Sequence, residues 1–183
     1  MKFFFFLIFS SITACSFAQL DTLFWFVAPE VAQSHGDRPI VFRFATLNQA
    51  ATITISQPAN PNFPSQVLNL VANDAQTLNL TNWIDQIENK PANTVLPYGF
   101  QISATAPIMA YYEVTPTCNC NPDIFALKGK NALGTSFVVP TQNYLNNASY
   151  ARSGFNIVAT QNNTQITIIP KQAIVGHPAN VPF

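Results

Sequence analysis

The sequence predicts an all-β protein made of antiparallel β-sandwich-like modules, and three observations support this fold class. Apolar and polar residues alternate with a period of two in many short runs, whereas no long run has helical spacing. Turn-forming residues separate these runs, as in the proline-containing stretches 58–64 and 91–99. The third observation is an internal repeat, in which residues 21–27 resemble residues 134–139. A propeller-like arrangement of four-stranded blades is the alternative.

The alternating runs predict the individual strands. In the run 40–44, Ile40, Phe42 and Phe44 share one face, and in the run 108–114 the even-numbered residues face inward. The same pattern predicts strands at 52–55, 67–71, 78–81, 100–104, 155–159 and 166–168. Residues 83–89 are the one helical segment we expect, and they read as a short surface turn.

The repeat predicts two domains after residue 18. Residues 45–48 match 159–162, and the match of residues 53–55 with 166–168 follows it in the same order. The offset between copies is 113 residues at the start (134 minus 21) and 114 later (159 minus 45). Copy one is therefore placed at residues 19–133, and copy two at 134–183. Because copy two spans far fewer residues, we expect a fragment of a longer protein or an unusually short second copy.

The first 18 residues have the pattern of an export signal. A basic residue at position 2 precedes an unbroken apolar run at 3–9, and small residues then lead to Ala18. We expect cleavage between Ala18 and Gln19, which leaves 165 residues (183 minus 18). The alternative is a lipobox-like sequence at 12–15, in which Cys15 would carry lipid and become the N-terminus. The apolar run is too short to span a bilayer, which takes about 20 residues.

The composition is low in charge and rich in amides. Charged residues make up 9% of the chain, and the sequence contains 19 Asn and 12 Gln. Removal of the signal takes away one lysine, so seven basic and eight acidic residues remain and the net charge becomes −1. Such a chain has no basic field that would attract nucleic acid or an anionic membrane surface. Amides and hydroxyls therefore make the predicted surface polar, as is typical of exported β-proteins.

Two cysteines remain in the predicted mature chain, at Cys118 and Cys120. In an oxidising compartment they could form a local disulfide if a turn brings them together, or each could pair with a cysteine elsewhere. They could also be free thiols. A zinc site is disfavoured, because zinc takes four ligands and neither of the two histidines, His35 and His177, has ligand spacing to this pair. We expect no metal and no cofactor.

No catalytic constellation emerges from the sequence. Residues 129–136 resemble a phosphate loop, but Thr135 stands where that motif requires lysine. Asp85 and Glu88 are three residues apart and could share a helical face, an arrangement more typical of a solvated turn than of an acid/base pair. The aromatic run 24–26 could be a ligand platform, but alternation places Phe24 and Phe26 on the core side. We therefore expect a protein that is not an enzyme.

Three segments resemble one known family. Residues 121–140 read NPDIFALKGKNALGTSFVVP, residues 155–170 read FNIVATQNNTQITIIP, and residues 177–183 read HPANVPF. Together with residues 108–114 they resemble the N-terminal region of IgGFc-binding proteins, especially the bacterial versions in secreted, gliding-type surface proteins. The resemblance implies an exported β-rich module at the front of a long multidomain protein. No residue can be matched to an Fc contact, so no binding site is carried over.

These observations lead to one expectation about function and one alternative. We expect a non-catalytic, secreted or cell-surface module for recognition or structure, in adhesion or gliding-associated contact. Its partner would be an extracellular protein or a glycan, with no nucleic acid and no membrane insertion after signal removal. The alternative is an accessory protein- or carbohydrate-binding domain of an exported hydrolase, with the catalytic domain beyond residue 183.

Overall fold

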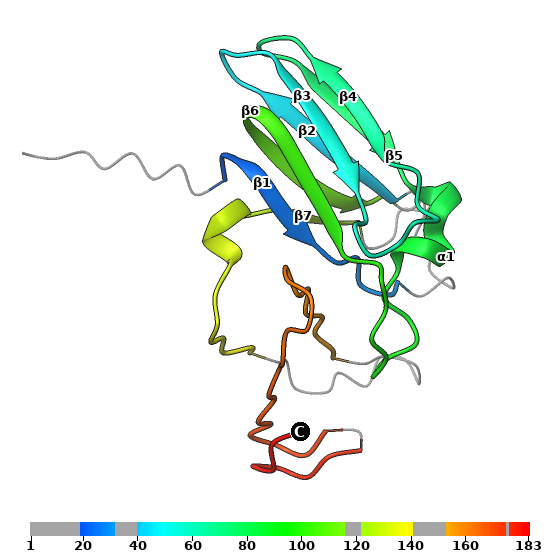
Figure 1. Ribbon diagram of the computed structural model, residues 1–183, viewed down its shortest axis with the longest axis vertical. Helices are drawn as coiled ribbons and strands as arrows, with labels where there is room; N and C mark the ends of the chain where they lie inside the picture. Colours follow the sequence, from blue (N-terminus) through cyan, green and yellow to red (C-terminus); the bar gives the residue numbers. More distant parts are fainter. Residues whose placement is uncertain (1–18, 32–39, 116–121, 141–152, 175) are drawn as a thin grey trace, which may run out of the picture.

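One antiparallel sheet of seven strands dominates the computed structural model, which describes residues 19–31, 40–115, 122–140, 153–174 and 176–183 (Figure 1). The signal segment, Cys15, Ala18, Cys118 and Cys120 lie outside the described residues. In chain order the strands are β1 (Asp21–Phe26), β2 (Ile40–Thr46), β3 (Ala51–Ser56), β4 (Gln66–Leu70), β5 (Ala75–Asn79), β6 (Phe100–Val114) and β7 (Asp123–Ala126).

The long strand β6 organises the sheet, because four other strands pair with it. Its first part pairs with β1 on one edge and with β3 on the other. Its last seven residues pair with β2, and its final residues also pair with β7. β2 and β3 therefore follow each other along the same edge of β6, with a break at residues 47–50.

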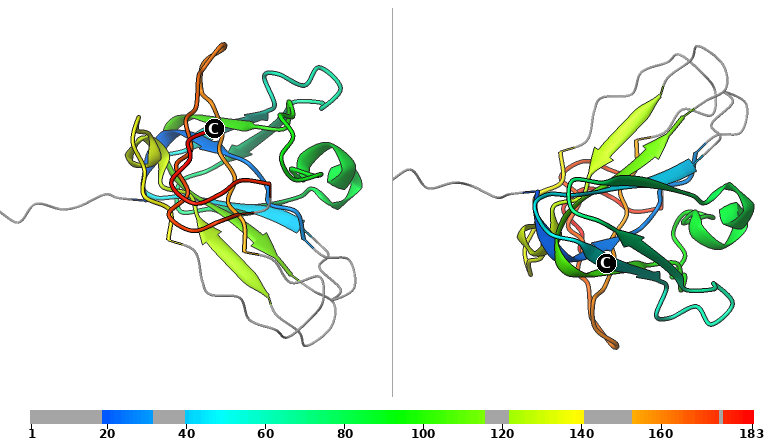
Figure 2. Two further views of the ribbon diagram at one scale, coloured as in Figure 1. Left: turned by 90° about the horizontal axis from the view of Figure 1, so that it is seen from below. Right: turned by 90° about the horizontal axis from the view of Figure 1, so that it is seen from above.

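The sheet curves until it nearly closes into a barrel. The strand order is β4-β3-β6-β2-β5, and the two end strands are joined directly through residues 71–74. Figure 2 shows this curvature along the axis of the sheet. The expected sandwich of separate sheets is corrected to a single bent sheet, and propeller blades are not seen in the described residues. The reason is β6, whose 15 residues are long enough to belong to both halves of the sheet.

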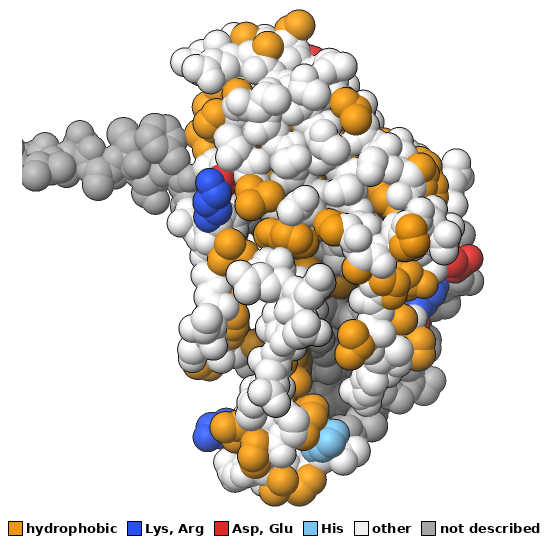
Figure 3. Space-filling model, in the orientation of Figure 1, with side chains coloured by type: hydrophobic (Ala, Val, Ile, Leu, Met, Phe, Trp, Pro, Cys, Tyr) orange, Lys and Arg blue, Asp and Glu red, His pale blue; other side chains and the backbone are white. Residues whose placement is uncertain are grey.

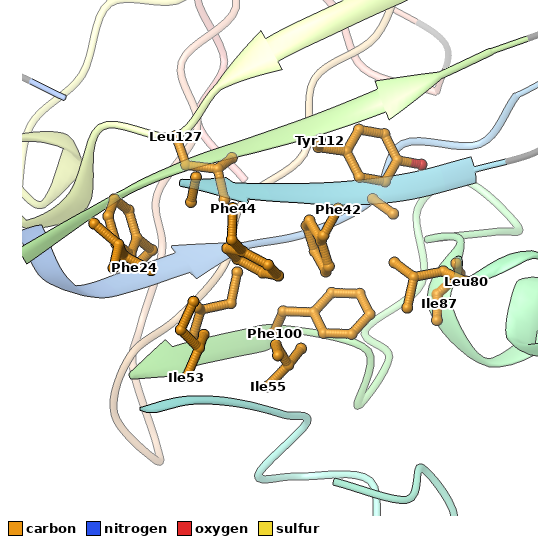
Figure 4. Close-up of a cluster of buried hydrophobic side chains, with 14 of the residues drawn as sticks. Phe24, Phe42, Phe44, Ile53, Ile55, Leu80, Ile87, Phe100, Tyr112 and Leu127 are labelled. Atoms are coloured by element: carbon orange, nitrogen blue, oxygen red, sulfur yellow. The ribbon is translucent and has the colours of Figure 1, made fainter. Parts of the chain in front are cut away.

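Aromatic side chains from both halves of the sheet meet in the core (Figure 4). The ring of Phe42 on β2 lies 5.2 Å from the ring of Phe100 on β6, at an interplanar angle of 86°. Such edge-to-face contacts are a favoured aromatic geometry. Phe26 packs on Phe42 and Tyr112, while Phe24 is fully buried. The aromatic run at the start of β1 is thus core on its two even positions, as alternation predicts.

Period-two alternation correctly predicts the orientation of β6 side chains. Ile108, Ala110, Tyr112 and Val114 are buried, and the residues between them are not. The predicted runs 100–104 and 108–114 form one strand across Pro107. The predicted helical turn is present as a 3₁₀ helix, η2 (Thr81–Trp83), followed by α1 (Ile84–Ile87). It is more than a surface turn, because Ile84 and Ile87 are buried in the core.

The described residues after position 133 do not show the predicted tandem repeat. A second 3₁₀ helix, η3 (Gly129–Ala132), ends the ordered part of the barrel, and no described residue of 134–183 belongs to a named strand. The expected strands at 155–159 and 166–168 are irregular. Figure 1 shows this C-terminal segment, coloured orange to red, lying beside the barrel rather than within its sheet. The all-β class is confirmed, and the repeat is not shown.

Candidate functional site

A buried carboxylate beside α1 is the most polarised group of the described structure. The side chain of Glu88 is 1% exposed, and its Oε2 lies 2.9 Å from Nζ of Lys90. The same ammonium lies 3.6 Å from Oδ1 of Asp85, whose side chain is 87% exposed. The two carboxylates noted in the sequence are therefore brought to one cation, but they differ completely in burial. The sequence spacing indicated their proximity and carried no signal of the burial of Glu88.

Burial and charge shift the acid–base properties of this cluster. Burial raises the pKa of Glu88, and the hydrogen bond and positive charge of Lys90 offset that effect only in part. The hydrogen bond to Glu88 in turn raises the pKa of Lys90. Burial, and then the charge of Glu88, also raise the pKa of Tyr112. The hydroxyl of Tyr112 has no hydrogen-bond partner among the described residues. This arrangement anchors α1 against the barrel and presents no exposed acid/base pair.

A second polar junction joins the beginning of β1 to η3. The Oδ2 atom of Asp21 accepts a hydrogen bond of 2.7 Å from the backbone N–H of Lys130. Gly129 has a φ of +56°, and a Cβ at this position would collide with the side chain of Asp21. The segment that resembles a phosphate loop in the sequence is thus a tight turn held by a carboxylate. A phosphate would meet the charge of Asp21 at this turn.

A shallow hollow of about 320 Å³ lies on the outer side of the sheet where β3 and β4 begin to bend. Its polar rim is neutral: Oγ1 of Thr52 donates to Oδ1 of Asn69 over 2.8 Å, and Oγ1 of Thr105 accepts from the backbone N–H of Thr52 over 2.9 Å. Hydroxyl and amide groups of this kind can contact polar neutral ligands. The hollow is lined by Ala50, Ala51, Thr52, Asn69, Leu70, Val71 and Thr105.

Charged groups are sparse on the face shown in Figure 3, where lysine, arginine and acidic side chains lie apart from one another. Arg43 pairs with Glu113 across neighbouring strands on the outside of the sheet. Within the described ranges no three His, Cys, Asp or Glu side chains are grouped closely enough to hold a metal ion. The same residues contain no helix that is long and apolar enough to cross a membrane.

The described structure places only one of the predicted processing and cysteine positions. Gln19, the expected mature N-terminus, is exposed beside β1. Ala18, Cys15 and the pair Cys118 and Cys120 lie outside the described residues, so cleavage, lipidation and disulfide formation stay predictions.

Comparison with known proteins places the chain first by class and then by family. The fold is all-β, with an antiparallel barrel-like sheet and a C-terminal segment that lacks described strands. Residues 124–183 match the family model described as IgGFc binding protein, which confirms the family resemblance for these 60 of the 183 residues (183 minus 124 plus 1). The match contains β7, η3 and the C-terminal segment, and it begins after most of the barrel strands.

Two further comparisons complete this picture. A structure titled "Crystal Structure of Thermotoga maritima 1070" aligns with a TM-score of 0.37 and 10% sequence identity, over 59% of this chain and 96% of that chain. No curated protein matches the sequence.

Proposed function

We propose that this chain is an exported, non-catalytic module that serves recognition or structure at the cell surface or in secreted material. The observation that carries the proposal is the match of residues 124–183 to the IgGFc binding protein family, whose name describes binding. The predicted export signal supports the same location. Adhesion or gliding-associated contact is the role that agrees with both.

The outer surface of the barrel supports contact through hydrogen bonds. Thr52 and Asn69 bond to each other on the outside of neighbouring strands, while Ile53 between β3 and β6 points into the core. Neutral hydroxyls and amides do not steer a charged partner over long distances. We therefore propose an extracellular protein or a glycan as the partner, recognised at short range.

Localisation is the first test. The chain with its own N-terminus is expressed in a bacterial host, and intact cells are treated with an added protease before fractionation. We expect the chain in the medium or in the protease-sensitive surface fraction. Mass spectrometry should find Gln19, cyclised to pyroglutamate, at the N-terminus, whereas lipid on Cys15 would replace this cleavage with anchoring. Retention in the cytoplasm with Met1 intact would refute the proposal.

Binding is the second test, made with the exported chain. Biolayer interferometry with immobilised human IgG Fc examines whether the binding named for the family extends to this chain. A glycan array examines the alternative partner class. We expect saturable binding to a member of one class that survives raised salt, because the surface is nearly neutral. Hydrolysis of an array glycan by the purified chain would contradict the non-catalytic role.

A further inference from the structure

Apolar residues with strand spacing remain exposed in the C-terminal segment. Phe137 is 65% exposed, although Phe24, its equivalent at an offset of 113, is 0% exposed. Ile166 is 43% exposed, although its equivalent Ile53 is 0% exposed. Figure 3 shows apolar side chains exposed at the bottom of the view, where Figure 1 places the C-terminal segment. The same sequence words are therefore covered in one place and uncovered in the other.

The first copy shows what covers these words. Phe24 on β1 lies opposite Ile102 of β6, and Ile55 on β3 lies opposite the same Ile102 from the other edge. β6 is thus inserted between β1 and β3, and it supplies backbone partners to both. The described residues after position 133 include no strand equivalent to β6. A β6-like strand is what the residues equivalent to β1 and β3 lack.

One edge of the β3-equivalent residues is already occupied. Ile168 and Phe183 exchange two backbone hydrogen bonds, of 3.0 and 3.1 Å, as opposite residues of an antiparallel pair do. In such a pair the flanking residues direct their N–H and C=O groups to the opposite edge. No described residue forms a backbone hydrogen bond with Thr167 or Ile169. The free edge of residues 166–169 is therefore of the kind that accepts an added strand.

We propose that residues 166–169 accept a β-strand from another polypeptide, whose alternate apolar residues cover Ile166 and Ile168 while residues 134–139 take its second edge. Backbone hydrogen bonds would supply affinity and the alternating side chains specificity, as in β-strand addition generally. This inference rests on the proposed recognition role and names the class of partner for it.

Charge and topology define the partner further. Residues 153–169 contain no Asp, Glu, Lys or Arg, so the partner strand gains nothing from charge and should alternate apolar with neutral polar residues. A second copy of this chain cannot donate β6, because both edges of that strand are paired within the barrel. The donor is therefore a different polypeptide with an unpaired strand of β6-like pattern.

The test uses the exported chain and a synthetic peptide with the sequence of residues 100–114 as the probe. The control peptide has the same composition, with its apolar residues grouped so that they no longer alternate. Isothermal titration calorimetry should show saturable binding of the first peptide and at least about tenfold weaker binding of the second. Hydrogen exchange should show new amide protection at residues 166–169 in the complex.

Matched variants locate the surface. Ile166→Thr should weaken binding of the alternating peptide by about tenfold, because it removes apolar area from the contact. Val67→Thr, at a 57% exposed valine on the outside of β4, should leave binding unchanged. Circular dichroism and thermal unfolding of both variants show whether the barrel remains folded.

Four results would overturn the inference: no binding of the alternating peptide, equal binding of the control peptide, an unchanged affinity for Ile166→Thr, or protection elsewhere in the chain. Self-association that Ile166→Thr abolishes would assign the edge to a second copy and would also overturn it. These results leave the localisation test untouched, so failure of the strand acceptor and failure of the proposed export can be told apart.

Discussion

Asp21 and Lys130 are 109 residues apart in the sequence and are joined by a hydrogen bond from the backbone N–H of Lys130 to the carboxylate of Asp21. The ammonium of Lys130 lies 3.5 Å from the other carboxylate oxygen. This contact fastens the first residue of β1 to η3, at the start of the segment that matches the IgGFc binding protein family. The family-matched residues are thus anchored to the barrel by a charge-assisted hydrogen bond.

Asp21→Asn tests this anchor through pH. Burial alone would raise the pKa of Asp21, but hydrogen bonds from Lys130 and Thr22 and the charge of Lys130 lower it overall. The stabilisation is therefore present above the ordinary carboxyl pKa of about 4 and is lost as pH falls through the lower, folded-state pKa. We expect the variant to lose about 1.5 kcal/mol in urea unfolding at neutral pH and less in acid.

Asp123→Asn is the matched control, because Asp123 begins β7 and its carboxylate accepts only the backbone N–H of the next residue among the described contacts. It should change the free energy of unfolding by less than about 0.5 kcal/mol. Equal effects of the two substitutions at neutral pH would show that the junction with Lys130 contributes nothing.

Gly129→Ala tests the tight turn of the same junction. The left-handed φ of +56° disfavours alanine, and the added Cβ would collide with Asp21. We expect a loss of about 2 kcal/mol in thermal or urea unfolding. Gly176→Ala has a left-handed φ of +85° and no atom within 4 Å of the new Cβ, so it should cost less and report the backbone effect alone. A smaller loss for Gly129→Ala than for Gly176→Ala would contradict the collision.

Lys90→Met tests the buried carboxylate of Glu88. The substitution leaves Glu88 buried without its cation, and we expect a loss of about 3 kcal/mol at neutral pH. Because burial raises the pKa of Glu88 above its unfolded value, the folded variant takes up a proton more readily than the unfolded chain. Its stability deficit should therefore narrow as pH falls through that raised pKa.

Urea unfolding at several pH values measures this effect, with Lys171→Met as the control at an exposed lysine. The control should change the free energy of unfolding by less than about 0.5 kcal/mol at every pH. A deficit of Lys90→Met that is independent of pH would place the loss in packing rather than in the charge of Glu88.

Phe24→Ala and Phe137→Ala compare equivalent positions of the sequence repeat. Phe24 is enclosed by the barrel core, so its truncation should cost about 4 kcal/mol through lost burial and a residual cavity. Phe137 is largely exposed, and its truncation should change unfolding by less than about 0.5 kcal/mol. Differential scanning calorimetry distinguishes the two. A comparable loss at both positions would mean that residues 134–139 are packed as β1 is.

Sequence periodicity was sufficient for most of the barrel and insufficient for the C-terminal segment. Alternation at 40–44 and 108–114 correctly predicts which side chains are buried, because the side-chain direction in a strand follows from its period of two. The same alternation at 166–168 predicts a strand that is not formed among the described residues. Alternation reports that a segment can pair, whereas pairing also needs a neighbouring strand, which β6 supplies to β3.

The candidate site was less accessible to sequence reasoning than the fold. The spacing of Asp85 and Glu88 indicated a shared turn, but the burial of Glu88 depends on how α1 packs on the barrel. Similarly, residues 129–136 resembled a phosphate loop, and only the contact with Asp21 shows a turn stabilised by a carboxylate. Contacts of this sequence separation leave no local pattern that could predict them.

The sequence by itself determined the β class, the orientation of the core side chains and the family resemblance, because each is carried by local spacing or by short motifs. The tertiary structure decided that the strands form one nearly closed sheet, since the 15 residues of β6 pair with strands of both halves. It also decided that Glu88 is buried and that Ile166 is exposed. Burial is a property of the neighbours that a residue acquires on folding, and equal sequence words acquire different neighbours.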